Sequence, residues 1–337
     1  MPACCRAFSF RGLALLCVLT FAGGAWAQSD IDEVHLTRRE GSAVVAKVNP
    51  GVDSALNTYT KPIRKNVDLV LVPVTITDAL NRLVLGLQKD NFQVLEGKKP
   101  QAIEHFSSED APVSVGILLD TSGSMANKMD RAREAVTKFC NDANPQDEFF
   151  MITFSDEPRL VEDFTPRTEE LESKLMGAQV DGQTSLLDAI YMGITWMRDA
   201  RYSRKALLII SDGGDNHSRY TEAEVKSSIK EADVVIYAVG IYDRYFPTEE
   251  ERLGPELLSD IAELTGGQAF TLDNPNDLPA VVSRVGVALR NQYVLAYHPE
   301  NSQHDGKWHK IKIKLKLPTR LAFLHVHAKA GYYAASE

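Results

Sequence analysis

An acidic side chain and two hydroxyls follow an apolar stretch about a third of the way along the chain. The stretch is Val113–Leu119, and Asp120, Ser122 and Ser124 come directly after it. A run that is nearly continuous in Val, Ile and Leu is typical of a strand buried on both faces of a parallel sheet. Ligands of open α/β sheets bind at the carboxyl ends of such strands. One carboxylate and two hydroxyls are hard oxygen ligands, so the pattern favours Mg²⁺, Mn²⁺ or Ca²⁺ over zinc or copper.

Two further stretches place oxygen ligands at the same edge of the expected sheet. The first contains Thr184, directly before a predicted helix that begins at Ser185. The second is the apolar run Leu207–Ser211, which leads into Asp212 and two glycines. Three separate loops would then each supply an oxygen to one place.

Each stretch also has a purely structural interpretation. Ser122 and Ser124 could merely start the following helix, because Ser is a favoured N-cap residue. Ser185 and Asp188 have the spacing of a capping box. The Asp212-Gly pair is common where a strand turns into a loop.

Taken together, the three stretches resemble the metal-ion-dependent adhesion site of von Willebrand factor type A domains. The resemblance covers residues 111–291, and all three motifs match in order and in residue type. It implies a bound Mg²⁺, Mn²⁺ or Ca²⁺ with one coordination position open to solvent, which an Asp or Glu carboxylate of a partner protein completes. The residues that correspond to the family's metal ligands are Asp120, Ser122, Ser124, Thr184 and Asp212.

Alternating strands and helices must position these loops. Apolar strands that alternate with amphipathic helices over residues 111–291 predict an α/β fold with a doubly wound, Rossmann-like, mainly parallel sheet. The expected strands are Val113–Leu119, Phe149–Phe154, Ala206–Ser211 and Val234–Val239. The expected helices are Lys128–Asp142, Ser185–Arg198, Glu222–Glu231, Pro255–Leu264 and Leu278–Arg290.

Residues 66–110 and 292–337 have β character on either side of this unit. Neither has enough strands to be stable alone, so we expect them to pair into a small β-sandwich with the α/β domain inserted between them. Trp308–Leu317 alternates apolar residues with a row of lysines. We interpret the row as a solvated face that protects a sheet edge, with an anionic surface as the alternative ligand. The segments Val294–Pro299 and Lys329–Ala334 resemble a VWFA-related family of Acidobacteria, which implies no known activity.

The N-terminus has the pattern of a secretory signal. Residues 1–27 contain two arginines, a short apolar core and a small-residue cleavage site that ends at Ala27. A polar leader follows over residues 28–65. We therefore expect a secreted or periplasmic protein without a membrane span in the mature chain, because no second apolar stretch approaches 18 residues. Cys140 would be the only mature thiol, in the core of its helix.

These features favour a metal-dependent protein-binding or adhesion module over an enzyme. The alternatives are a Mg²⁺-dependent phosphohydrolase and a structural scaffold of the envelope. Aspartyl phosphohydrolases carry a second carboxylate two residues after the nucleophile, and here that residue is Ser122. A net charge of −9 argues against a nucleic-acid partner, and the oligomeric state stays open.

Five other polar residues could contribute to a site. A second metal site at His325 and His327 is a weaker hypothesis, because no third ligand is in view. Asp156 and Asp215 would lie on the rim of the metal edge, and His217 is expected to be a loop residue.

Overall fold

The computed structural model describes residues 69–212, 214–242, 249–300, 306–317 and 323–334. The predicted signal peptide and leader, including Cys4, Cys5 and Cys17, lie outside the described residues. Within the described part of the chain, no helix has the length and apolarity needed to cross a membrane.

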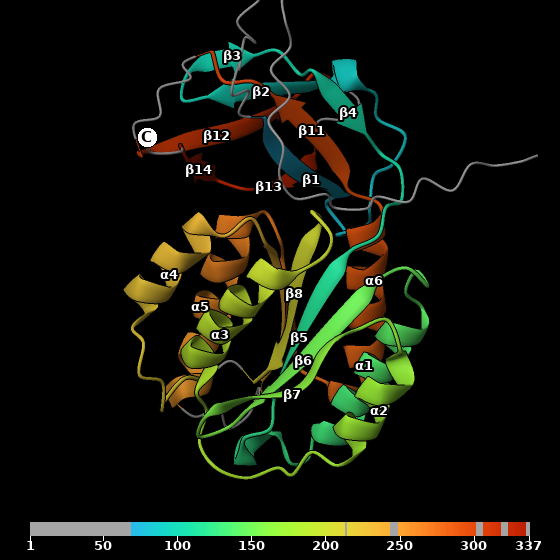
Figure 1. Ribbon diagram of the computed structural model, residues 1–337, viewed down its shortest axis with the longest axis vertical. Helices are drawn as coiled ribbons and strands as arrows, with labels where there is room; N and C mark the ends of the chain where they lie inside the picture. Colours follow the sequence, from blue (N-terminus) through green and yellow to red (C-terminus); the bar gives the residue numbers. More distant parts are fainter. Residues whose placement is uncertain (1–68, 213, 243–248, 301–305, 318–322, 335–337) are drawn as a thin grey trace, which may run out of the picture. The chain divides into compact units, whose positions relative to one another are not determined.

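A six-stranded sheet forms the centre of the α/β unit (Figure 1). The strand order is β10-β9-β8-β5-β6-β7, and all neighbours are parallel except β6 and β7. The α/β prediction with a mainly parallel sheet is therefore confirmed. The strands are β5 (Ser114–Asp120), β6 (Glu148–Phe154), β7 (Pro158–Thr165), β8 (Lys205–Ser211), β9 (Val235–Ile241) and β10 (Ala269–Leu272).

Helices cover both faces of this sheet (Figure 1). One layer is α1 (Met129–Asn141), α2 (Thr168–Met176) and α6 (Leu278–Arg290). The other is α3 (Leu186–Trp196), α4 (Glu222–Glu231) and α5 (Glu249–Thr265). Short 3₁₀ turns occur at Lys89–Asn91, Gly123–Met125, Met197–Asp199 and Pro275–Asp277.

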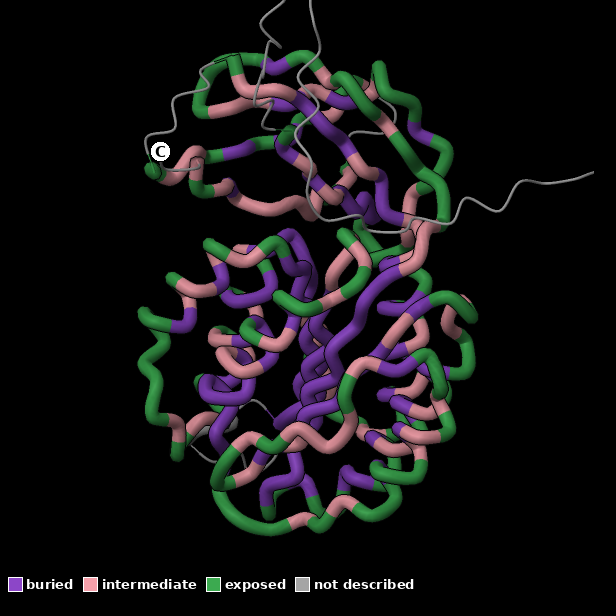
Figure 2. The backbone as a smooth tube through the Cα atoms, in the orientation of Figure 1, coloured by how far each residue is buried: buried purple, intermediate pink, exposed green. Residues whose placement is uncertain are grey.

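The central strand β5 is buried along its whole length, which explains its continuous apolar sequence (Figure 2). Ile117 and Leu119 pack with the α1 and α6 layer, and Leu118 packs with the α3 layer. Gly116 lies where a Cβ atom would overlap the ring of Phe150 and approach the Leu207 side chain to 2.6 Å. Only glycine fits this position. Close packing on both faces therefore fixes the position of β5 and of Asp120 at its end.

The β segments on either side form two four-stranded sheets, with orders β13-β1-β11-β4 and β14-β12-β2-β3. Strands from both ends of the chain pair with each other, as β1 does with β11 and β2 with β12. The strands are β1 (Val70–Asp78), β2 (Phe92–Glu96), β3 (Lys99–Gln101), β4 (His105–Ser107), β11 (Tyr293–Tyr297), β12 (Trp308–Leu315), β13 (Leu324–Ala328) and β14 (Gly331–Tyr333).

Alternating apolar residues of the two sheets share one core. Val72 and Val74 of β1 are fully buried, and Ile311 and Ile313 of β12 are buried opposite them. The buried Tyr293 hydroxyl accepts a hydrogen bond from the Leu87 amide (3.1 Å) and donates one to a loop carbonyl (3.0 Å). The loop after β1 is thereby fastened to β11.

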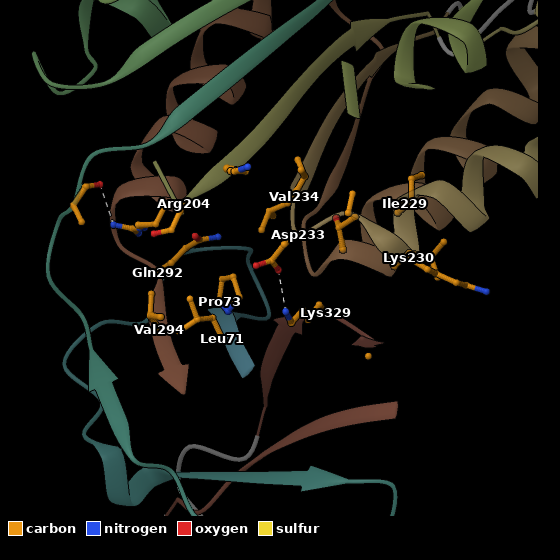
Figure 3. A pocket seen from close by; sticks show the side chains of 18 of the residues that line it. Leu71, Pro73, Arg204, Ile229, Lys230, Asp233, Val234, Gln292, Val294 and Lys329 are labelled. Carbon is orange, nitrogen blue, oxygen red and sulfur yellow. Dashed lines mark hydrogen bonds and ion pairs between the residues drawn. The ribbon is translucent and has the colours of Figure 1, made fainter. Parts of the chain in front are cut away.

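A cavity of about 270 Å³ lies beside the amino-terminal ends of β8 and β9, where the sandwich meets the α/β unit (Figure 3). Leu71, Val234 and Val294 contribute apolar walls. An ion pair between Lys329 and Asp233, with Nζ and Oδ1 2.9 Å apart, links the two parts next to it. The predicted metal residues instead follow the carboxyl ends of their strands.

Candidate metal site

Asp120 is the last residue of β5 and is completely buried. Its Oδ1 accepts a hydrogen bond from the backbone amide of Ser122 (2.9 Å), and its Oδ2 accepts one from the Ser211 hydroxyl (2.6 Å). These two donors fix the orientation of the carboxylate. Ser211 ends the neighbouring strand β8, directly before Asp212.

The hydroxyls of Ser122 and Ser124 lie 3.0 Å apart in the loop that follows β5. Ser122 occupies the N-cap position of a 3₁₀ turn, but its side chain makes no capping hydrogen bond. The helix-capping alternative for this residue is therefore wrong. The Ser122 hydroxyl instead lies beside the Asp120 carboxylate, and the Ser124 hydroxyl lies next to that of Ser122.

The second predicted motif is joined to the first by backbone hydrogen bonds. The amide of Gly123 donates to the carbonyl of Gly182 (3.0 Å), and the amide of Asp181 donates to that of Thr121 (3.0 Å). Thr184 is 4% exposed, so it lies at the inner side of this loop.

The predicted capping box at the start of α3 does not form. Ser185 has no capping hydrogen bond, and its hydroxyl is buried without a partner in the described structure. The Asp188 carboxylate accepts the amides of Arg219 and Tyr220 (2.8 and 3.0 Å) and so positions the loop after β8. The capping interpretation of Ser185 and Asp188 is wrong.

The third motif reaches the same place from β8. Asp212 is 2% exposed, and its Oδ2 lies 3.2 Å from the Nζ of Lys128, at the start of α1. The Thr184 carbonyl accepts the amides of Asn216 and His217, each at 3.1 Å. Hydrogen bonds therefore connect all three loops at one edge of the sheet.

Burial and charge make the Asp120 carboxyl unusually easy to protonate. Removal from water is the main cause, and the nearby Asp212 charge adds to it; together they raise the pKa of Asp120 to about 7. Hydrogen bonds from Ser122 and Ser211 oppose this shift. A buried pair of carboxylates is costly unless a cation compensates it.

The chemistry of these residues fits a hard divalent cation. Among the described residues, no group of three or more His, Cys, Asp or Glu side chains could hold a metal ion. Here only two carboxylates, Asp120 and Asp212, come together, so the remaining ligands would have to be hydroxyl oxygens. Carboxylate and hydroxyl oxygens are ligands that Mg²⁺, Mn²⁺ and Ca²⁺ accept.

The rim residues predicted from the sequence shape the loops. An Asp156 oxygen accepts the Gln183 amide (2.7 Å), and an Asp215 oxygen accepts the Leu187 amide (3.2 Å). His217 is exposed.

His325 and His327 lie on β13, in the sandwich. The Nε2 of His327 is 3.1 Å from the Thr77 hydroxyl and 2.7 Å from the Gln268 amide nitrogen. Desolvation lowers the pKa of this histidine. The described residues offer no third ligand beside the two histidines.

Sequence reasoning missed two residues of this site, Lys128 and Ser211. The sequence predicts Lys128 only as the start of a helix, and nothing in its spacing indicates a contact with Asp212. It predicts Ser211 only as the end of a strand. The strand register would identify Ser211. Leu119 of β5 lies opposite Ile210 of β8, so the residues that follow them, Asp120 and Ser211, are neighbours.

Comparison with known proteins gives a partial match. The family model described as "von Willebrand factor type A domain" matches residues 115–214. Inter-alpha-trypsin inhibitor heavy chain H4 of Bos taurus is 28% identical over 134 residues, which are 36% of this chain and 15% of that protein. The Homo sapiens protein is 26% identical over 134 residues, 36% and 14% of the two chains. This chain thus spans about 15% of the length of these relatives.

The solved structures that the comparison finds are distant in sequence. A von Willebrand factor type A protein from Catenulispora acidiphila is 14% identical, covers 79% of this chain and 75% of its own, and has a TM-score of 0.47. The vWF domain of the type V pili tip protein Mfa5 from Porphyromonas gingivalis is 14% identical, with coverage of 53% and 95% and a TM-score of 0.44. Over residues 115–214, this chain is therefore similar to von Willebrand factor type A domains.

Proposed function

We propose that this chain is an extracytoplasmic adhesion module that captures an acidic side chain of a partner protein through a divalent cation. The observation that carries the proposal is the meeting of two buried carboxylates, Asp120 and Asp212, with hydroxyls on hydrogen-bonded loops. Helix capping does not explain this set of oxygens, because the Ser122 side chain makes no capping hydrogen bond.

The five predicted ligands divide into two kinds. Asp120 and Asp212 would supply the negative charge, and Ser122, Ser124 and Thr184 would supply neutral oxygens. A bound Mg²⁺ or Mn²⁺ would be an electrophile, and a carboxylate of the partner protein could complete its coordination shell. Ser211 keeps Asp120 in place, because its hydroxyl donates to the oxygen that the Ser122 amide does not reach.

The exposed surroundings of the site affect which partner can approach. Asp156, Glu157 and Asp181 are exposed in the loops beside the metal edge. Their negative charge disfavours a uniformly acidic partner. We therefore expect an acidic residue within a neutral or basic surface. The predicted signal peptide and the adhesion role implied by the family resemblance support a site of action outside the cytoplasm.

A Mg²⁺-dependent phosphohydrolase is the main alternative. Ser122 stands at the position where an aspartyl phosphohydrolase has a second carboxylate, and the Ser122 hydroxyl is paired with that of Ser124. This favours binding over phosphoryl transfer. Mg²⁺-dependent hydrolysis of p-nitrophenyl phosphate that Asp120→Ala abolishes would support the enzyme instead.

The test combines metal binding with partner capture. Titration calorimetry with Mn²⁺ should show one site in the wild type and none in Asp120→Ala, because the loss of this carboxylate removes a charged ligand. Glu157→Ala is the matched control, since it removes an exposed acid of the rim whose side chain is 63% exposed, and this variant should bind Mn²⁺ normally.

Partner capture uses the same three proteins. Immobilised wild type and Glu157→Ala should retain an envelope protein of the parent organism in Mg²⁺ and release it in EDTA. Asp120→Ala should retain none. Equal capture with and without chelator would refute a metal-dependent contact, and a bound cation without any captured protein would favour the scaffold alternative.

A further inference from the structure

Three lysines project from one face of β12 in the sandwich. Lys310, Lys312 and Lys314 are exposed, and they alternate with Ile311 and Ile313, which are buried in the core. Successive lysines on one face of a strand are about 7 Å apart, because a strand rises about 3.3 Å per residue. The row is therefore a straight line of positive charge.

Protection of a sheet edge explains only part of this row. β12 pairs with β2 on one side, and on the other side β14 covers only Trp308–Lys310. Lys310 therefore lies on a paired part of the strand and shields no edge. For Lys312 and Lys314 the edge interpretation from the sequence stays a prediction, and a ligand is a second reason for the complete row.

The lysines also lack acidic neighbours. Residues directly opposite each other on paired strands point to the same face, and those opposite the three lysines are Gly331, Leu95 and Gln93. Within the described ranges, none of the three ammonium groups lies within 4.0 Å of a carboxylate. Their charges are left to solvent or to a ligand.

An aromatic pair continues the row at one end. Trp308 lies two residues before Lys310, on the same face of β12, and its ring meets that of Tyr333 at 5.1 Å in an edge-on arrangement. The Nζ of Lys230, from α4, lies 5.9 Å from the centre of the Trp308 ring. A fourth cation therefore stands beyond the aromatic pair.

We propose that this face binds a linear acidic polysaccharide, laid along β12 from Lys314 toward Trp308. The cations follow a line, which suits a polymer with repeated negative groups better than a planar membrane. Lys230 projects over Trp308 and would hinder a flat bilayer at that end. Aromatic side chains give sugar rings an apolar surface to pack on.

The expected extracytoplasmic location of the protein favours a glycan over a nucleic acid as the ligand. The predicted signal peptide would carry the chain to the envelope, where acidic polysaccharides are available. The chain as a whole has a net charge of −9, so attraction of a polyanion depends on this local face. The proposal does not rest on the metal site, because no residue of the lysine row belongs to it.

The probe is heparin, a sulfated linear polysaccharide, with binding to the full chain measured by calorimetry in EDTA. Lys312→Glu combined with Lys314→Glu should weaken binding at least tenfold, because attraction becomes repulsion at two positions. Arg159→Glu combined with Lys174→Glu is the control; it makes the same charge change at exposed positions of β7 and α2 and should change binding less than twofold.

Salt dependence and competing polyanions complete the test. The logarithm of the wild-type binding constant should fall with the logarithm of salt concentration with a slope of about −2 to −3, as expected for a few ion contacts. Absence of heparin binding, or equal weakening in both double variants, would overturn the proposal. Tighter binding to single-stranded DNA or to phosphatidylglycerol vesicles would assign the face to those ligands instead. Circular dichroism should show that both variants are folded.

Discussion

Replacement of Lys128 by methionine tests the electrostatics of the buried edge most sharply. The Lys128 side chain is 8% exposed and that of Asp212 is 2% exposed, and their charged atoms are 3.2 Å apart. Methionine keeps much of the side-chain length and removes the charge. Loss of one partner from a buried ion pair usually costs about 3–5 kcal/mol, because the other charge is left uncompensated.

The pKa of Asp120 limits this loss and makes it depend on pH. The pKa of Asp120 is about 7 in the folded protein and 3.8 for an ordinary Asp. At high pH, the ionised Asp120 therefore lowers the free energy of unfolding by about 4 kcal/mol. Below pH 7 a proton can replace part of the charge that Lys128 supplied. At about 1.4 kcal/mol per pH unit, we expect a destabilisation of about 3 kcal/mol at pH 8 and about 1 kcal/mol at pH 6.

Urea unfolding in EDTA at the two pH values measures both numbers. Lys138→Met is the control, because it removes an ion pair of the same helix in which Lys138 and Asp142 are 48% and 43% exposed. Such a surface pair contributes at most about 0.5 kcal/mol. Mg²⁺ should stabilise Lys128→Met more than the wild type, since the ammonium group no longer repels it. A Lys128→Met loss at pH 8 no larger than that of Lys138→Met would refute this account.

Three further predictions concern the core and the site. Tyr293→Phe should lower the free energy of unfolding in urea by about 2 kcal/mol, because the buried Leu87 amide loses its acceptor; a change below 0.5 kcal/mol would contradict the assignment. Gly116→Ala should cost about 2–3 kcal/mol in thermal unfolding, because its methyl group overlaps the Phe150 ring; an unchanged melting temperature would show that the core adapts freely. Without metal, protonation of Asp120 favours the fold between pH 3.8 and about 7, so stability in EDTA should fall as pH rises through that range, while Mg²⁺ affinity measured by calorimetry should rise; parallel changes would be inconsistent with metal binding to the carboxylate.

Continuous apolar runs made the interior of the α/β unit predictable. The strand at Val113–Leu119 and the helix at Glu222–Glu231 are found within one residue of their expected ends. β7 was missed because it is an antiparallel edge strand of mostly half-buried residues. α2 was missed because only Leu171 and Leu175 are buried in it, which is too few to give a clear helical period.

The site was predictable where its residues are close in the sequence. Asp120, Ser122 and Ser124 are two residues apart, so spacing alone suggested a shared ligand. The contacts of Ser211 and Lys128 depend on which strands are neighbours and on how α1 begins, and local patterns do not encode these. The lysine row was visible as an alternation, but the place of its strand between β14 and β2 required the sheet order.

The central claim is that one divalent cation binds between the three loops. Anomalous diffraction from a crystal grown with Mn²⁺ tests it directly. We expect a single strong peak within coordination distance of the Asp120 carboxylate and of the Ser122 and Ser124 hydroxyls, close to Thr184 and Asp212. A crystal at saturating Mn²⁺ without a peak at this edge, or with manganese bound only elsewhere, would contradict the account.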